Sequence, residues 1–236
     1  MKIGVMQPYF FPYIGYWQLL YAVDKFVILD DVNYITRGFI NRNSILINGK
    51  ANRFTIPVLH ASQNKLILEM KLCFSLEEKR KFLDKLKYSY KNAPQFATVY
   101  NLIKEIIMNE TDDLTDYIVF SIEQVKQYLE INTPILISSQ ITKDPNLKAQ
   151  DRIIAICKRL KGDIYVNPSG GRQLYNSEEF ERESLKLFFL DPIMENIKYK
   201  QFDNDFVNYL SIIDMLMFNE VVSIKEFLKM YKLNVE

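Results

Sequence analysis

The chain alternates between short apolar runs and stretches whose apolar residues recur at helical spacing. Residues 2–6 and 25–29 are apolar runs, and residues 17–23 between them repeat apolar positions at the period of an α-helix. The order strand, helix, strand predicts a βαβ unit, whose two strands run parallel and are joined by a right-handed crossover. An aromatic loop, residues 7–16, is expected between the first strand and the helix.

An antiparallel part is expected next. Two apolar runs within residues 44–58 flank Asn48-Gly49, a pair that suits the tight turn of a β-hairpin. Residues 65–72 are expected to extend this antiparallel part.

The middle of the chain then becomes helical. Ser75 followed by Glu78 is typical of a capped helix start and predicts a helix over residues 76–90. Two more helices are expected after Pro94, at about residues 96–109 and 112–130.

The βαβ pattern returns after this helical block. The remaining strands are predicted at residues 134–138, 163–167 and 185–189, and the remaining helices at 148–161, 204–218 and 223–232. The fold class is therefore α/β, a Rossmann-like parallel sheet with an antiparallel hairpin insertion and a helical subdomain. The expected division is a core of residues 1–74 and 132–192 with the hairpin at about 44–72, a helical lid of residues 75–131, and a C-terminal helical segment of residues 193–236.

Composition narrows the function classes. The 236 residues hold 30 Lys and Arg against 29 Asp and Glu, so a strongly cationic nucleic-acid binder is not indicated. Cys73 and Cys157 lie too far apart for a zinc knuckle or a redox pair, and both are expected to be reduced and in the core. No apolar stretch is long enough to span a membrane and no secretory signal is evident, which predicts a soluble, cytoplasmic protein.

The loop after the first strand carries a spaced motif. Pro12-Tyr13-Ile14-Gly15-Tyr16 has the spacing of the Pro-His-x-Gly-His loop of nucleotidylyltransferases and class I synthetases, which predicts a fold of that kind. In those folds the glycine lets a nucleotide lie on the helix N-terminus. Here tyrosines replace both histidines and offer hydrogen bonds without charge. Gln7, Pro8 and Tyr9 precede the motif and are candidates for the same site.

Two further loops follow strand ends, where ligands of open parallel sheets bind. The second strand ends at Asp30-Asp31, which suit a sugar hydroxyl, an amine, a metal ion or a turn cap. The second of these loops follows the strand predicted at residues 163–167 and contains Gly170-Gly171. Two adjacent glycines allow close backbone approach to an anion or form an ordinary tight turn. The remaining candidates from these loops are Arg37, Asn41, Arg42, Asn167, Pro168, Ser169, Gly170, Gly171 and Arg172.

Four other residues outside these loops could contribute to chemistry. Ser211 and Asp214 lie one helical turn apart in an apolar segment, where a buried carboxylate needs a partner; they serve either the site or a neighbouring element. His60, the single histidine, has no recognisable nucleophile near it, and Cys157 lies in an amphipathic helix. The loops therefore offer Asp, Tyr, Lys and Arg, a set that suits binding of an anionic or sugar-like ligand.

The aromatic loop also carries a family resemblance. Met6 to Leu19, with its Gln-Pro-Tyr-x-x-Pro-Tyr-x-Gly-Tyr core, resembles the N-terminal signature of the WbqC-like family, and the resemblance extends over about residues 2–228. Asn167 departs from it, because members often begin this loop with Ser-Gly. Members occur among bacterial O-antigen and other surface-polysaccharide genes, and some have been proposed to transfer glycine to an amino sugar.

The resemblance implies a cytoplasmic transferase that joins glycine or a similar small acyl group to the amine of a nucleotide-linked amino sugar. Its partners are then that sugar and an acyl or amino-acid donor, with no nucleic acid. ATP with Mg²⁺ is a possible cofactor, and no resident metal is expected. The expected catalytic residues are Tyr13, Tyr16, Asp30 and Asp31, and the expected binding residues are Gln7, Pro8, Tyr9, Gly15, Arg37, Asn41, Arg42, Asn167, Ser169, Gly170, Gly171, Arg172, Ser211 and Asp214. The alternatives are a nucleotidylyltransferase that uses ATP or CTP, and a non-catalytic sugar-binding or scaffold protein.

Overall fold

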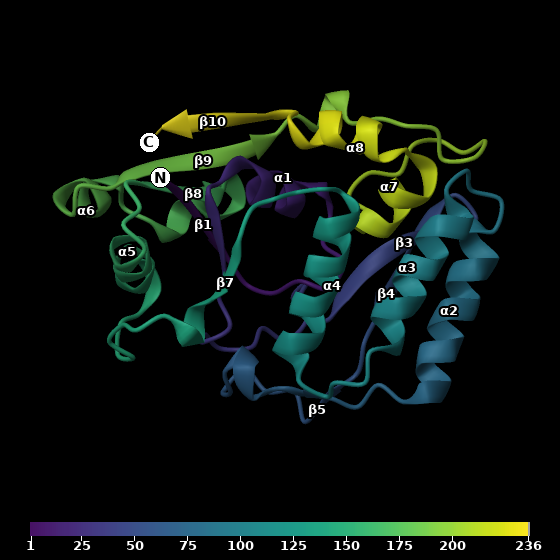
Figure 1. Ribbon diagram of the computed structural model, residues 1–236, viewed down its shortest axis with the longest axis horizontal. Helices are drawn as coiled ribbons and strands as arrows, with labels where there is room; N and C mark the ends of the chain where they lie inside the picture. Colours follow the sequence, from purple (N-terminus) through teal and green to yellow (C-terminus); the bar gives the residue numbers. More distant parts are fainter. Residues whose placement is uncertain (236) are drawn as a thin grey trace.

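A six-stranded sheet forms the centre of the computed structural model, which describes residues 1–235 (Figure 1). Its strand order is β10-β9-β8-β1-β2-β7, and every neighbouring pair is parallel except β9 with β10. The strands are β1 (Lys2–Met6), β2 (Lys25–Ile28), β7 (Ile135–Ile137), β8 (Ile164–Pro168), β9 (Lys186–Pro192) and β10 (Tyr231–Val235).

The strand order reverses between β1 and β8. From β1 the chain adds β2 and then β7 on one side, and afterwards β8, β9 and β10 on the other. The carboxyl ends of the five parallel strands therefore meet at one edge, here called the carboxyl edge. A reversal of this kind leaves a crevice outside the strand ends, where α/β proteins bind their ligands. The predicted α/β class with a mainly parallel sheet is confirmed.

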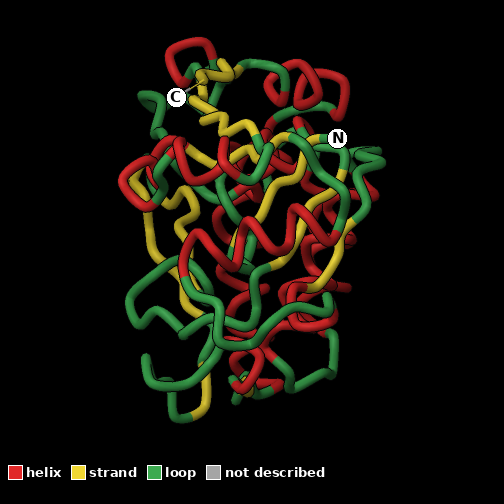
Figure 2. The backbone as a smooth tube through the Cα atoms, turned by 90° about the vertical axis from the view of Figure 1, so that its left-hand side faces the viewer, coloured by secondary structure: helices red, strands yellow, loops and turns green. Residues whose placement is uncertain are grey.

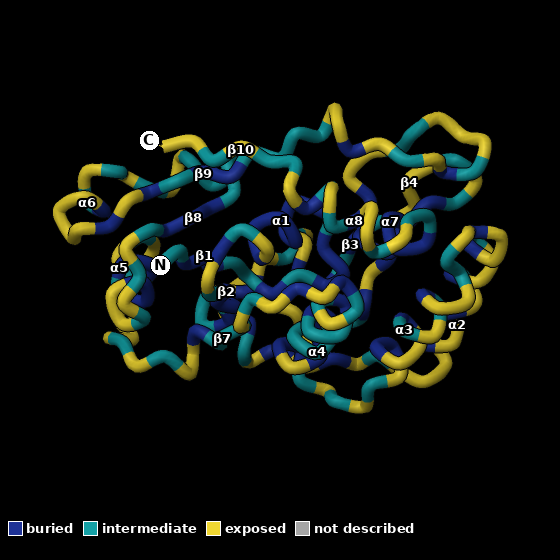
Figure 3. Tube along the Cα trace, turned by 45° about the horizontal axis from the view of Figure 1, so that its top comes forward, coloured by how far each residue is buried: buried dark blue, intermediate teal, exposed yellow. Residues whose placement is uncertain are grey.

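Helices cover both faces of the sheet. Figure 2 shows strands running through the middle of the molecule, helices around them and many loops toward the bottom of the view. One apolar layer joins Ile3, Val5 and Val27 of the sheet to α5 (Ala149–Arg159) and α6 (Ser177–Arg182). On the other face α1 (Ile14–Ala22) packs on the strands and on α8 (Val221–Leu228). Figure 3 shows β8 and α1 buried in the interior, whereas much of α6 and α2 is exposed at the periphery.

The middle of the chain packs into the same core as α1. Helices α2 (Leu76–Tyr90), α3 (Phe96–Met108) and α4 (Leu114–Tyr128) follow the hairpin of β3 (Arg42–Ile47) and β4 (Lys50–Thr55). Their positions agree closely with the sequence-based prediction. Within residues 65–72, Ile67–Glu69 form a 3₁₀ turn, and the short strand β6 (Lys71–Leu72) pairs with β5 (Val58–Leu59) in a separate two-stranded sheet.

The hairpin turn and the start of α2 form for the predicted reasons. Asn48 and Gly49 both have positive φ, of 50° and 71°, as the tight turn requires. The Ser75 hydroxyl accepts from the Glu78 N–H, and the Glu78 carboxylate accepts in return from the Ser75 N–H. Two backbone N–H groups at the helix start, which have no partner within the helix, thereby gain acceptors.

Two predictions about the C-terminal segment are wrong. Helix α7 spans only Ile212–Phe218, so residues 204–211 are not helical, and β10 replaces the end of the helix predicted over 223–232. Tyr231, Leu233 and Val235 alternate with polar residues, which is the pattern of a strand, and the helix predicted over 223–232 extended into the start of this strand. Helix α6 was also missed; its six residues are too few to show a period.

The two cysteines differ from each other. Both are free, as expected, but Cys73 is exposed, so its predicted place in the core is wrong. It follows Leu72 of β6, whose side chain is buried; successive strand residues face opposite sides. Among residues 1–235, no helix has the length and apolar character needed to cross a membrane.

Candidate functional site at the carboxyl edge

The loop after β1 turns its two motif tyrosines in different directions. Tyr16 is buried, and its hydroxyl donates to the Gln7 carbonyl at 3.2 Å. Burial raises the pKa of Tyr16 well above its ordinary value, so the phenol stays neutral. Tyr13 is half-buried and folds back over Gly15: a Cβ built on Gly15 would lie 2.4 Å from the Tyr13 hydroxyl oxygen. The space above the motif glycine is thus filled by a side chain.

An aromatic cavity of about 310 Å³ opens beside this loop. Four rings line it, arranged as two tilted pairs: the ring centroids of Tyr9 and Phe39 are 6.1 Å apart, and those of Tyr13 and Tyr209 are 6.3 Å apart. Phe39 and Tyr209 are 62% and 65% exposed, so they form its rim. Its lining residues are Tyr9, Pro12, Tyr13, Phe39, Asn43 and Tyr209.

The two carboxylates after β2 bind neighbouring loops in different ways. Asp30 is buried and accepts from Ser139, which follows β7: the backbone N–H at 2.9 Å and the hydroxyl at 2.6 Å. Asp31 forms an ion pair with Lys143 at 2.7 Å and lies 3.7 Å from the Arg152 guanidinium. The Asp31 oxygen nearest to Arg152 is Oδ1, which is buried and has no hydrogen-bond partner.

Charge sets the protonation state of Asp31. Burial raises its pKa, but the Lys143 ammonium, the nearby Ser138 hydroxyl and the charge of Arg152 together lower it by more. The pKa of Asp31 therefore lies below its ordinary value, and the side chain is an anion at neutral pH.

The glycine loop follows β8 as a 3₁₀ turn over Ser169–Leu174. The space in front of Gly170 is empty, whereas Gly171 lies close to the Asn167 amide. Arg172 places its guanidinium 4.6 Å from the centre of the Phe189 ring and 3.7 Å from an oxygen of Asp191. The Arg172 side chain is 40% exposed, so it is positioned by its neighbours and remains partly accessible.

Of the other predicted arginines, Arg37 lies in the long loop after β2 and Arg42 is the first residue of β3. Arg37 is exposed and has positive φ, 65°, while Arg42 donates through Nε to the Gly38 carbonyl at 2.6 Å. Within residues 1–235, neither has a carboxylate within ion-pair distance. Both keep donors for an anionic ligand.

Three predicted residues have buried partners within the fold. Asn41 donates to the Ile56 carbonyl at 2.8 Å, and the Ser211 hydroxyl, which also caps α7, donates to the Phe11 carbonyl at 2.8 Å. Asp214 is fully buried and accepts from Tyr90, Tyr199 and Gln201. These side chains connect the hairpin, α2 and α7, and their predicted contact with ligand is untested.

Several residues at this edge were missed by sequence reasoning. Ser139 follows a predicted strand and had the same positional signal as Asp30. Lys143 and Arg152 had no local signal, because their common partner Asp31 is more than 100 residues away. Phe39 and Tyr209 join the cavity from two distant loops, and nothing in either segment indicates the other.

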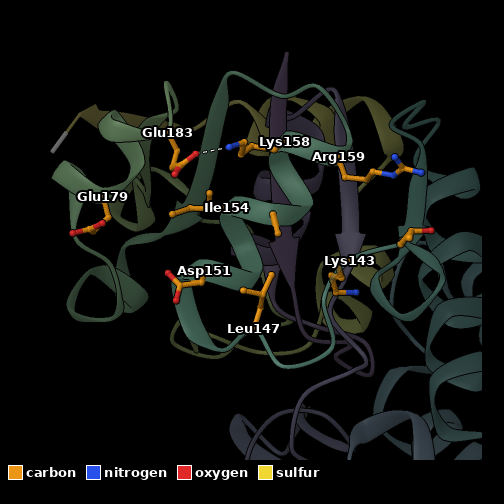
Figure 4. A pocket seen from close by; sticks show the side chains of 10 residues that line it. Lys143, Leu147, Asp151, Ile154, Lys158, Arg159, Glu179 and Glu183 are labelled. Carbon is orange, nitrogen blue, oxygen red and sulfur yellow. Dashed lines mark hydrogen bonds and ion pairs between the residues drawn. The ribbon is translucent and has the colours of Figure 1, made fainter.

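A larger hollow than the aromatic cavity lies elsewhere. About 610 Å³ in volume, it runs along α5 toward α6 and is lined mainly by charged side chains (Figure 4). Lys158 and Glu183 form an ion pair across it. It is open to solvent and contains none of the predicted site residues, so size alone does not make it the functional site.

The expected cofactor and metal can be compared with the residues present. In Pro-His-x-Gly-His proteins the nucleotide needs open space above the glycine, and here the Tyr13 ring fills that space. ATP therefore does not fit at this position with Tyr13 as it stands. No group of three or more His, Cys, Asp or Glu side chains converges within residues 1–235 in a way that suits a metal ion.

Comparison with known proteins agrees with the aromatic loop. Residues 7–226 match the description of the WbqC-like protein family. The chain belongs to that family. The uncharacterized protein Rv1507c of Mycobacterium tuberculosis (strain H37Rv) is 23% identical over 232 residues, which cover 97% of each chain. No solved structure matches the chain significantly.

The WbqC-like match spans all three loops of the carboxyl edge. It begins at Gln7 and continues beyond Tyr209, so the aromatic cavity and both arginine-bearing loops lie inside the family region. Strand β10, in contrast, lies outside the matched residues.

Proposed function

We propose that this WbqC-like protein is a transferase that binds a nucleotide-linked amino sugar at the carboxyl edge and joins glycine, or a similar small acyl group, to its amine. The observation that carries the proposal is the reversal of strand order between β1 and β8. It places the aromatic loop and the glycine loop side by side, at the position where open α/β sheets bind nucleotide ligands.

The charges of this edge suit a phosphate-bearing sugar. Arg37 and Arg42 have no ion-pair partner in the described chain, and Arg172 is held in place by Phe189 with part of its guanidinium accessible. Guanidinium groups form paired hydrogen bonds to phosphate oxygens. Gly170 adds an open backbone approach. These groups would hold the diphosphate while aromatic rings contact the uncharged parts.

The available side chains favour direct transfer without a covalent enzyme intermediate. Burial raises the pKa of Cys157 to about 12, and the residues that line the aromatic cavity include neither a cysteine nor a histidine. The sugar amine attacks the carbonyl of an activated glycyl ester or acyl phosphate. The amide C–N bond forms, the C–O bond to the activating group breaks with its electron pair leaving on oxygen, and an aspartate takes the amine proton.

Asp31 is the better placed of the two aspartates for that proton. Its Oδ1 has no hydrogen-bond partner, whereas both oxygens of Asp30 accept from Ser139. Asp30 then orients the loop after β7. In this arrangement Lys143 keeps Asp31 ionised, and therefore ready to accept a proton.

The test is a transfer assay read by mass spectrometry. Purified protein is incubated with nucleotide-linked amino sugars and an activated glycyl donor, and a product heavier by one glycyl residue is expected. The double variant Asp30→Asn/Asp31→Asn should lose more than about tenfold in rate, which is about 1.4 kcal/mol of barrier. Lys143→Met is the matched control, because it breaks the same ion pair and keeps the carboxylate.

Two outcomes contradict the proposal. A folded double variant that retains more than a tenth of the activity removes the aspartates from the reaction. Sugar binding without turnover by any donor favours a non-catalytic sugar-binding protein, for which the exposed rings of Phe39 and Tyr209 are the specific evidence.

A further inference from the structure

The aromatic cavity is lined by uncharged side chains. Four of its six lining residues are aromatic, and none carries a charge. The polar side chain of Asn43 is already used, because its amide donates to the Phe11 carbonyl and its oxygen accepts from the Ser44 N–H. The surfaces that face the cavity are therefore mostly ring surfaces.

Some aromatic rings of the protein have a lysine or arginine side chain over their face. Lys79 lies over Phe74 and Tyr117, and Arg172 lies over Phe189. Within residues 1–235, no lysine or arginine lies over Tyr9, Tyr13, Phe39 or Tyr209. The face of an aromatic ring is negative and attracts a cation within about 6 Å of its centre. Four rings around one space form a site for a positive ligand.

The tyrosine side chains of the cavity remain neutral, and their ring faces attract a cation as the Phe39 ring does. Burial, and secondarily Tyr13, raises the pKa of Tyr9, while burial and then Tyr209 raise that of Tyr13. Among the described residues neither hydroxyl has a hydrogen-bond partner, so both remain available to a ligand. The cavity volume of about 310 Å³ is at the lower end of the range for small-molecule sites. A small amine with part of its carrier fits that size.

We infer that the aromatic cavity binds the α-ammonium group of an aminoacyl donor, which makes the protein selective for glycyl over uncharged acyl groups. The inference rests on the proposed function and narrows its donor. It also assigns a chemical task to the rings: they favour the protonated α-amine, which keeps that amine from competing with the sugar amine as nucleophile.

The sugar amine is the other source of an ammonium group, and binding probes separate the two. Glycinamide carries the α-ammonium of a glycyl donor, propionamide has a similar shape without charge, and glucosamine carries the ammonium of an amino sugar. Each is titrated into the full-length protein, and chemical shifts of aromatic side chains report occupancy. We expect glycinamide to saturate the site and to bind at least about fivefold more tightly than propionamide or glucosamine.

Substitutions at the exposed rim test the ring face itself. Tyr209→Phe keeps the ring and should bind glycinamide within about twofold of the wild type, whereas Tyr209→Leu should weaken binding about fivefold. Phe39→Leu should weaken it to a similar degree. Both positions are more than half exposed, and urea unfolding confirms that the variants are folded.

Three results would overturn the inference: equal binding of glycinamide and propionamide, preferential binding of glucosamine, or equal loss in Tyr209→Phe and Tyr209→Leu. These readouts involve no turnover. A failed transfer assay with selective glycinamide binding rejects the proposed reaction alone, and transfer of glycyl and uncharged acyl groups at equal rates rejects the inference alone.

Discussion

The phenol ring of Tyr13 occupies the space in which a side chain at Gly15 would lie. A Cβ on Gly15 would come within 2.8 Å of three atoms of that ring. The glycine of this motif thus lets a tyrosine of the same loop fold back over the start of α1. This contact also fixes one wall of the aromatic cavity, because Tyr13 lines it.

We predict that Gly15→Ala is harmful only while Tyr13 is present. Alanine at a helical position is normally favourable by up to about 1 kcal/mol over glycine. Here the added methyl displaces the ring, and such overpacking costs about 1–3 kcal/mol. In a Tyr13→Ala background the same substitution should become neutral or stabilising. Urea unfolding of the four proteins measures this, and an equal effect of Gly15→Ala in both backgrounds would rule out the contact.

Asp214 is expected to be essential for stability. It accepts hydrogen bonds of 2.8 Å from Tyr90, 2.8 Å from Tyr199 and 2.6 Å from Gln201. Asp214→Ala leaves three buried donors unpaired, at about 1–3 kcal/mol each, so we expect a loss of at least about 3 kcal/mol in the free energy of unfolding. Asp84→Ala on the exposed face of α2 is the control and should change it by less than about 0.5 kcal/mol.

Asp214 should also impose a pH dependence. Burial raises its pKa despite the three hydrogen bonds. A carboxyl whose pKa is higher in the folded than in the unfolded state stabilises the fold below the unfolded value, and this contribution is lost as pH rises through the folded value. We therefore expect the stability of Asp214→Asn relative to wild type to improve as pH increases from about 4 to 7. A constant difference across that range would show that Asp214 does not titrate differently in the two states.

The contribution of Asp31 to stability should have the opposite pH dependence from that of Asp214. Its pKa is lowered in the folded protein, so its contribution is present above the unfolded value of about 3.9 and is lost as pH falls through the folded value. Asp31→Asn should cost about 2–3 kcal/mol near neutral pH, somewhat less than a fully buried pair because part of the carboxylate is exposed. Denaturant unfolding at pH 7 and pH 3 tests this: the penalty should shrink at the lower pH, and a penalty that grows would contradict the assignment.

The two thiols should react at very different rates. Cys73 is exposed, whereas Cys157 is buried and has a pKa raised to about 12. Because the thiolate is the reactive form, we expect a colorimetric thiol reagent to modify one cysteine per folded chain and two in urea. Cys73→Ser should abolish the fast reaction. Rapid modification of both thiols under native conditions would contradict the burial of Cys157.

Local sequence signals predicted the elements that are stabilised locally. The turn at Asn48-Gly49 and the capping box of Ser75 and Glu78 involve residues one to three positions apart, so spacing alone reveals them. Strand β10 owes its existence to pairing with β9, in which Leu233 lies opposite Leu190, and no local pattern indicates that partner.

Local sequence signals also predicted only part of the candidate site. The strand ends predicted that the three loops lie at one edge, because parallel strands bring their carboxyl ends together, and ligand binding by these loops stays a prediction. What each side chain does there depends on distant residues: Asp31 on Lys143 and Arg152, and the aromatic cavity on Phe39 and Tyr209. Asp214 lies close in sequence to Tyr209, yet it is directed into the core rather than into the cavity.

Calorimetric titration of a nucleotide-linked amino sugar tests the central claim most directly. The wild-type protein should bind it, and Arg172→Ala should bind it about tenfold more weakly, a loss of about 1.4 kcal/mol. Arg182→Ala, which removes a guanidinium paired only with Glu178 and Glu179 on α6, should bind as the wild type does. Absence of binding to the folded wild type, or equal binding by both variants, would contradict a nucleotide-sugar site at the carboxyl edge.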